Sequence, residues 1–140
     1  MYQKDYILRM IEMLGDLIAA ILGLAGKGDY GKATEKLERV YYDMLKEDAA
    51  FFRSIPMEEL TRKLLEEHNY TNGHLEILAE LFNAEAELEM AQGNRSGALE
   101  FSEKSLLLFE FTDLAQKTLS LVRVDKLNAI RERIETLRKS

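Results

Sequence analysis

Apolar residues recur every three or four positions along most of the chain, a period that predicts α-helices. Leu, Ala, Glu, Lys and Met, all good helix formers, are frequent. The sequence contains one proline, and no segment alternates β-branched with polar residues as a half-buried strand does. We therefore expect an all-α protein in which residues 1–140 form a single domain of five or six antiparallel helices.

The first expected helix, residues 2–25, has an unusually wide apolar face made of two stripes. The central stripe holds Ile7, Ile11, Leu14, Ile18 and Ile21, and the flanking stripe holds Tyr6, Met10, Met13, Leu17 and Leu24. A face this wide indicates neighbours on two sides. Gly15, Ala19 and Gly23 form a row of small residues, which lets another helix or a second copy of the chain approach closely.

Glycines mark the end of the first helix and an aspartate marks the start of the second. Gly26 and Gly28 end the first helix, and Asp29 can cap the next by accepting hydrogen bonds from its free amides. The inner face of the second helix is expected to carry Ala33, Leu37, Val40, Tyr41 and Met44. The end of this helix stays open, because residues 49–52 either extend it or turn back over the core.

Three further helices are expected before the last one. Pro56 starts a short helix that ends near His68, since proline fits the first turn of a helix. Residues 69–73 read as a loop. Two longer helices follow, at residues 74–92 and 96–110.

The last helix is expected to run to the C-terminus after a cap at Thr112 or Asp113. Its apolar stripe consists of Leu121, Val124, Leu127, Ile130, Ile134 and Leu137. The opposite side of this helix is charged, which is typical of a helix at the end of a stack.

Two turns share one arrangement, Gly28 to Ala33 and Gly93 to Ala98, each with a glycine, a polar pair and an alanine five residues after the glycine. This arrangement resembles the tetratricopeptide repeat, in which a helix hairpin has small residues where its helices cross and a glycine at the turn. Residues 98–106 are similar to the second helix of that motif, and Ala86 supplies a small position in the first. The resemblance implies a short stack of antiparallel hairpins with a capping helix at the C-terminal end.

The chain departs from that motif at several positions. Glu89 stands where the repeat usually has a tyrosine, and Ser102 and Ser105 replace a phenylalanine and an alanine. The two copies are 65 residues apart, near twice the usual period of about 34, which indicates an interrupted array. Residues 5–12 also resemble the start of a group of bacterial repeat-like proteins.

Composition and charge narrow the class of partner. The net charge of −6 opposes binding to nucleic acid, although six basic and only three acidic residues fall within residues 123–139. We attribute that basic segment to the helix dipole at the end of the last helix. The absence of cysteine agrees with a reducing compartment, and no export signal is visible, so we expect a cytoplasmic protein. Residues 17–25 are too short an apolar run to span a membrane.

The resemblance implies a partner-binding groove lined by the first helix of each hairpin. It places Glu80, Asn83 and Glu87 there, so that the groove is acidic and binds a basic or helical segment of a protein or peptide. The competing interpretation is a solvated helix face. The basic clamp that some members use for a C-terminal carboxylate is missing, since the matching positions are small or apolar.

No catalytic residue, cofactor site or metal site is expected. His68 and His74 lie near acidic residues, but a six-residue gap across a loop does not match the helical spacing of metal-binding pairs. No glycine loop has the spacing of a phosphate-binding motif. Two alternatives to an interaction module stay open: a structural homodimer built on the first helix, and a small helical enzyme or ligand-binding protein with a pocket between helices.

Overall fold

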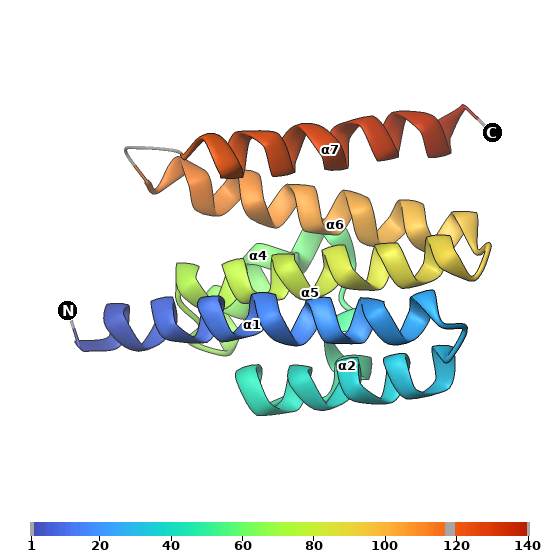
Figure 1. The fold of residues 1–140 in the computed structure, drawn as a ribbon. Helices are drawn as coiled ribbons and strands as arrows, with labels where there is room; N and C mark the ends of the chain where they lie inside the picture. The colour runs from blue at the N-terminus through green and yellow to red at the C-terminus, as the bar shows by residue number, and fades with distance from the viewer. Residues whose placement is uncertain (1, 117–119, 140) are drawn as a thin grey trace.

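The computed structural model describes residues 2–116 and 120–139, and in that part of the chain the regular structure is entirely helical (Figure 1). The elements are α1 (Tyr2–Gly26), α2 (Tyr30–Leu45), α3 (Ala49–Arg53), η1 (Met57–Glu59), α4 (Leu60–Arg62), η2 (Lys63–Glu67), α5 (Asn72–Ala91), α6 (Arg95–Leu114) and α7 (Leu121–Arg138). The all-α prediction is confirmed.

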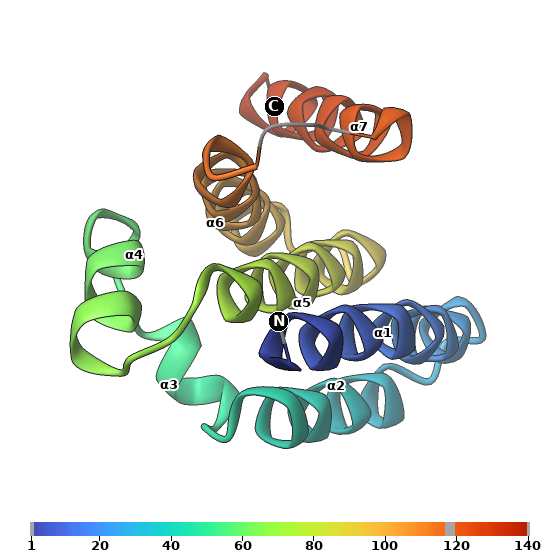
Figure 2. The same cartoon turned by 90° about the vertical axis from the view of Figure 1, so that its left-hand side faces the viewer.

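The long helices stack in a simple order. Figure 2 shows α2 and α1 at one end, followed by α5, α6 and finally α7. Helix α5 contacts both α1 and α2, and α7 packs against α6. The short elements from α3 to η2 lie on one side of this stack (Figure 2).

The turns that close the two hairpins have the same backbone geometry. Gly28 and Gly93 adopt positive φ angles of 85° and 80°, which glycine tolerates without steric cost. The amide of the next residue, Asp29 or Asn94, donates to the carbonyl oxygen five residues earlier, at 3.0 and 2.9 Å. This pattern ends a helix by satisfying its free carbonyl groups. The two glycine turns named from the sequence therefore close in the same way.

Each turn also starts the following helix in the same way. The side chains of Asp29 and Asn94 accept hydrogen bonds from the amides three residues later. Ala33 and Ala98 are fully buried where each hairpin closes. The predicted cap and inner face of the second helix are confirmed.

One aromatic chain joins the two hairpins through the core. The ring of Tyr41 in α2 lies 5.8 Å from Phe52 in α3 and 6.4 Å from Phe82 in α5, measured between ring centroids. Phe82 in turn lies 5.6 Å from Phe101 in α6. All four residues are buried, so these aromatics act as core.

The structure of the segment between the hairpins shows where the second helix ends. Lys46 adopts a left-handed conformation after Leu45 and ends α2, and α3 turns back over the core. The hydroxyl of Tyr70 donates to the carbonyl oxygen of Leu45 and fastens the far end of the segment to α2. The short helix expected after Pro56 is continuous from 57 to 67 but changes from 3₁₀ to α to π geometry.

The expected cap of the last helix is wrong. Helix α6 continues to Leu114, so Thr112 lies inside it, buried, with its hydroxyl donating to Phe109. The N-cap of α7 is Ser120, whose hydroxyl accepts from the amide of Arg123 at 3.1 Å. Threonine and aspartate are good caps, but a buried hydroxyl that bonds its own helix favours continuation.

Helix α1 has neighbours on two sides, α2 and α5, as its wide apolar face predicts, but they cover its flanking stripe only in part. Met10 is buried, whereas Tyr6, Met13 and Leu17 of the flanking stripe are exposed. Among the described residues, no other helix packs into the small-residue row, since a Cβ added at Gly15 or Gly23 would meet none of their atoms within 4 Å.

Candidate functional site

The three residues expected in a partner groove face the last helix of the same chain. The ammonium of Lys126 in α7 donates to both carboxylate oxygens of Glu80, at 2.8 and 2.6 Å. The guanidinium of Arg133 donates to the side-chain oxygen of Asn83 and lies 4.0 Å from Glu87. Burial raises the pKa of Glu87, although the charge of Arg133 acts in the opposite direction. The structure thus brings all three residues together on one side of α5.

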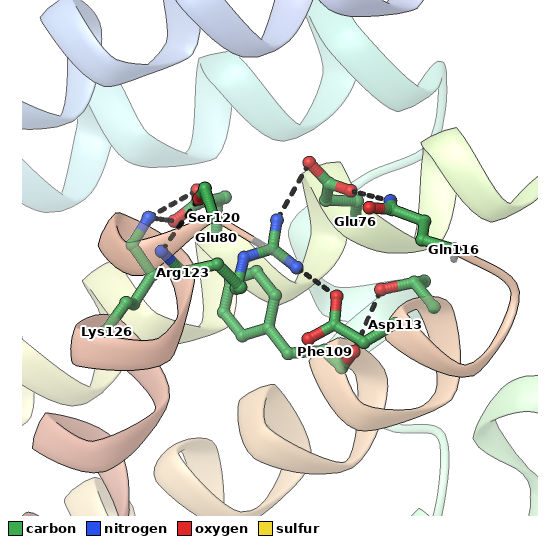
Figure 3. A network of polar contacts seen from close by, with 9 residues as sticks. Glu76, Glu80, Phe109, Asp113, Gln116, Ser120, Arg123 and Lys126 are labelled. Carbon is green, nitrogen blue, oxygen red and sulfur yellow. Dashed lines mark hydrogen bonds and ion pairs between the residues drawn. The ribbon is translucent and has the colours of Figure 1, made fainter. Parts of the chain in front are cut away.

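Arg123 links α7 to both α5 and α6 (Figure 3). Its guanidinium pairs with Glu76 at 3.0 Å and with Asp113, and it lies 4.6 Å from the centroid of the Phe109 ring. The side-chain amide of Gln116 donates to Glu76 at 3.4 Å. The side chains of Glu76, Asp113 and Arg123 are largely buried, so their charges interact in a medium less polar than water.

Together these contacts form a ladder of opposite charges between α5 and α7. The acidic side supplies Glu76, Glu80 and Glu87, and the basic side supplies Arg123, Lys126 and Arg133. The basic segment of the last helix therefore has partners inside the molecule, beyond the helix dipole.

Sequence reasoning missed Glu76 and Arg123. Glu76 lies one helical turn before Glu80, and Arg123 lies three residues before Lys126, so the same faces contain them. The sequence signal that could have found them is the match between the acidic face of α5 and the basic face of α7.

A recess opens beside this ladder, between α1, α5 and α7. One part, of about 350 Å³, is lined by Ile11, Glu76, Glu80, Gln116, Ser120, Val122, Arg123 and Lys126. A second part, of about 540 Å³, is lined by Ile7, Leu8, Ile11, Thr71, Asn72, Gly73, Glu76, Thr112, Ala115, Gln116 and Arg123. The two parts share four residues and adjoin one another. We call the whole the α1–α5–α7 recess.

The α1 side of this recess is apolar and closely packed at its base. Ile7, Leu8 and Ile11 supply the side chains, and Leu8 is 50 % exposed. At the start of α5, a Cβ on Gly73 would lie 2.5 Å from Cγ2 of Ile7, so only glycine lets α1 come this close. The recess therefore has an apolar wall opposite a floor of ion pairs.

Another recess, of about 590 Å³, lies between α6 and α7, away from the ladder. Leu106, Leu107 and Ile134 are among its lining residues. The ion pair at its edge, between Arg131 and Glu110, is about half exposed, and exposed pairs are weak.

A separate ionic cluster, which includes the buried Glu85, lies between α2, α3 and α5. Nε of Arg53 donates to Glu85 at 3.0 Å, and the same guanidinium pairs with Glu38 at 2.8 Å. Burial raises the pKa of Glu85 despite Arg53, and burial followed by the nearby charge of Glu85 raises that of Tyr41 well above its usual value. None of these four side chains lines the recesses described above.

Both histidines are in contact with aromatic rings. His74 stacks on Tyr70 at 4.9 Å, and its Nδ1 accepts a hydrogen bond from the amide of Thr71 at 3.1 Å. His68 lies 4.8 Å from the ring of Phe51. Among residues 2–116 and 120–139, no three His, Cys, Asp or Glu side chains are grouped so that they could hold a metal ion.

Within the same residues, no helix combines the length and the apolar character needed to cross a membrane. Comparison of the chain with protein-family models, with curated proteins and with solved structures finds no match.

Proposed function

We propose that this chain is a non-enzymatic interaction module of tetratricopeptide-like architecture, which binds a segment of a partner protein in the α1–α5–α7 recess. The two hairpins with equal turns support this architecture. The first helix of each hairpin, α1 or α5, contributes to the recess, as the resemblance implies.

The observation that carries the proposal is the combination of an apolar wall with a fixed polar floor. Leu8 and Val122 stand at its rim and are 50 % and 74 % exposed, although exposed aliphatic side chains gain free energy when a partner covers them. Glu76 and Arg123 hold one another in place and need no rearrangement before binding. Such a surface suits an amphipathic segment.

The chemistry of the recess also indicates how that segment lies. Its apolar side chains contact Ile7, Leu8 and Ile11, and its polar groups face Gln116 and the ion pairs. Glu80 takes part from the floor of the recess. Binding by Asn83 and Glu87 requires Arg133 to release them, since both are already engaged.

Two of the perturbed ionisable groups lie away from the recess, which supports a role without catalysis. Glu85 and Tyr41, whose pKa values are raised, are held in the interior beside Arg53. His74 caps a helix. The proposal includes no cofactor, and the net charge of −6 favours a protein or peptide over a nucleic acid. A cytoplasmic location belongs to the same proposal.

Selection of peptides from a random display library on the wild-type protein tests this function. We expect peptides with alternating apolar and polar faces and micromolar affinity. The double variant Leu8→Ser with Val122→Ser should lose most of that affinity. The matched control is Met90→Ser, because Met90 is an exposed apolar residue outside the recess.

The result can also contradict the proposal. Selected peptides that bind the recess variant and the wild type equally well would place their site elsewhere. A library that yields no binder after repeated rounds would remove the support for an interaction module.

A further inference from the structure

A second apolar surface lies on the opposite side of α1, away from the α1–α5–α7 recess. Tyr6, Met13 and Leu17 on it are 61 %, 59 % and 40 % exposed. Between α1 and α2 it continues as a groove of about 260 Å³, lined by Leu17, Ala20, Ile21, Lys36, Arg39, Val40, Asp43 and Met44. This hairpin is the end of the stack opposite α7 (Figure 2). We call this surface the end face.

The second hairpin shows the equivalent face of α5 and α6 with a neighbour packed against it. With the 65-residue offset of the turns, Met13, Leu17 and Lys36 correspond to Leu78, Phe82 and Phe101. All three of the corresponding residues are buried. In the second hairpin, therefore, this is a stacking face, and the preceding elements cover it.

Direct contacts identify that cover. Phe82 packs against Tyr41 of α2. Arg39 corresponds to Lys104, whose ammonium donates to the carbonyl oxygen of Arg53 at the end of α3. In the first hairpin, the equivalent side chains Met13 and Leu17 remain exposed in the part of the chain that the structure describes.

The charges on the end face complement a second copy of themselves. Lys36 and Asp43 lie on α2, two helical turns apart, and both line the groove. Neither forms an ion pair with another described residue. Arg39, between them, pairs with Glu35 of its own helix at 3.2 Å. In a two-fold, antiparallel arrangement, Lys36 of each copy faces Asp43 of the other, so one contact occurs twice.

We propose that the end face is the two-fold interface of a homodimer, in which Met13 and Leu17 pack across the axis and Lys36 pairs with Asp43 of the other copy. A partner of one predominant charge would leave either Lys36 or Asp43 opposite a like charge. A second copy of the chain satisfies both, while Arg39, which lies near the axis, keeps its pair with Glu35 of its own helix.

Sedimentation equilibrium of the full chain tests the dimer, with Lys36→Asp, Asp43→Lys and the double exchange as variants. Both positions are exposed, so these changes leave the fold intact, which circular dichroism verifies. Each single variant sets like charges against one another twice and should weaken dimerisation at least about tenfold. The double exchange restores both pairs and should recover the wild-type affinity to within about threefold.

The control Lys27→Asp carries the same charge change as Lys36→Asp outside the groove and should leave the dimer unaffected. A wild-type chain that stays monomeric at about 0.5 mM overturns the proposal. A dimer that survives Leu17→Glu, or single variants that the double exchange does not rescue, also overturns it, because the contact then lies elsewhere or in another register.

The dimer and the partner-binding recess can fail independently. Leu17→Glu alters the end face and should leave binding of the selected peptides unchanged. Leu8→Ser with Val122→Ser alters the recess and should leave the dimer unchanged.

Discussion

His74 connects the stability of α5 to pH through the contacts of its Nδ1 with Thr71. Its Nδ1 can accept from the amide of Thr71 only while that nitrogen carries no proton. Burial lowers its pKa below the usual value, so between the two values the unfolded chain binds more protons than the folded one. The stabilisation is therefore complete above about pH 6.5 and is lost as the pH falls through the lowered pKa.

We expect the free energy of unfolding of the wild type to fall between pH 7 and pH 5 relative to that of His74→Gln. Urea unfolding at several pH values measures the difference in this free energy between the two proteins. Buried acids such as Glu85 contribute equally to both, so their effect cancels in the difference. His68→Gln is the control, because His68 does not cap α5. Parallel pH profiles for the wild type and His74→Gln would rule this role out.

Replacement with alanine should change the stability of the protein in opposite directions at two kinds of glycine. Gly93 has a φ of 80°, and an alanine there costs about 1–2 kcal/mol because its Cβ disfavours left-handed backbone. Gly23 lies inside α1 with open space around its Cβ position, so alanine should stabilise the protein by roughly 0.5–1 kcal/mol. Thermal and urea unfolding measure both, and equal effects of the two substitutions would contradict the assignment.

At the scale of elements, α7 depends on Arg123 for its attachment near the N-terminal end. Replacement with methionine leaves the largely buried carboxylates of Glu76 and Asp113 without a cation. We expect a loss of about 3 kcal/mol in unfolding free energy, since an uncompensated buried charge is costly.

The matched control is Arg131→Met on the same helix. Its pair with Glu110 is about half exposed, and we expect a loss below about 1 kcal/mol. Chemical denaturation gives both values. Similar losses in the two variants would mean that α7 is held by its apolar contacts alone.

The elements could be predicted from the sequence where local signals decide them. The glycine turns, the Asp29 cap and the buried face of α2 depend on residues within one or two helical turns. The end of α6 could not be predicted from the sequence. Thr112 resembles a cap, and only its burial by other elements shows that the helix continues.

The candidate site, like the elements, could be predicted from the sequence only in part. Its place on α5 followed from a motif, so Glu80, Asn83 and Glu87 could be named from the sequence. Their partners could not, since Lys126 is 46 positions from Glu80 and no local pattern joins them. Charge on a helix shows that a face is polar, whereas tertiary contacts determine whether solvent or another helix meets it.

At the scale of the molecule, the two hairpins share one core and should unfold together. Tyr41 and Phe82 belong to different hairpins and lie in one buried cluster that extends to Ile134 of α7. A single core of this kind supports a two-state transition. We expect a calorimetric enthalpy on the order of 100 kcal/mol near 60 °C, equal to the van't Hoff value. Separate transitions for the two hairpins would contradict a shared core.

The contacts that Arg53 makes also limit how this chain can change during evolution. Arg53 belongs to the segment between the hairpins, yet its guanidinium neutralises Glu85 of the second hairpin and its carbonyl oxygen accepts from Lys104. A deletion that shortened the spacing to a regular period would leave Glu85 buried without a cation. The intervening segment therefore cannot be lost in one step, and a substitution at Glu85 has to come first.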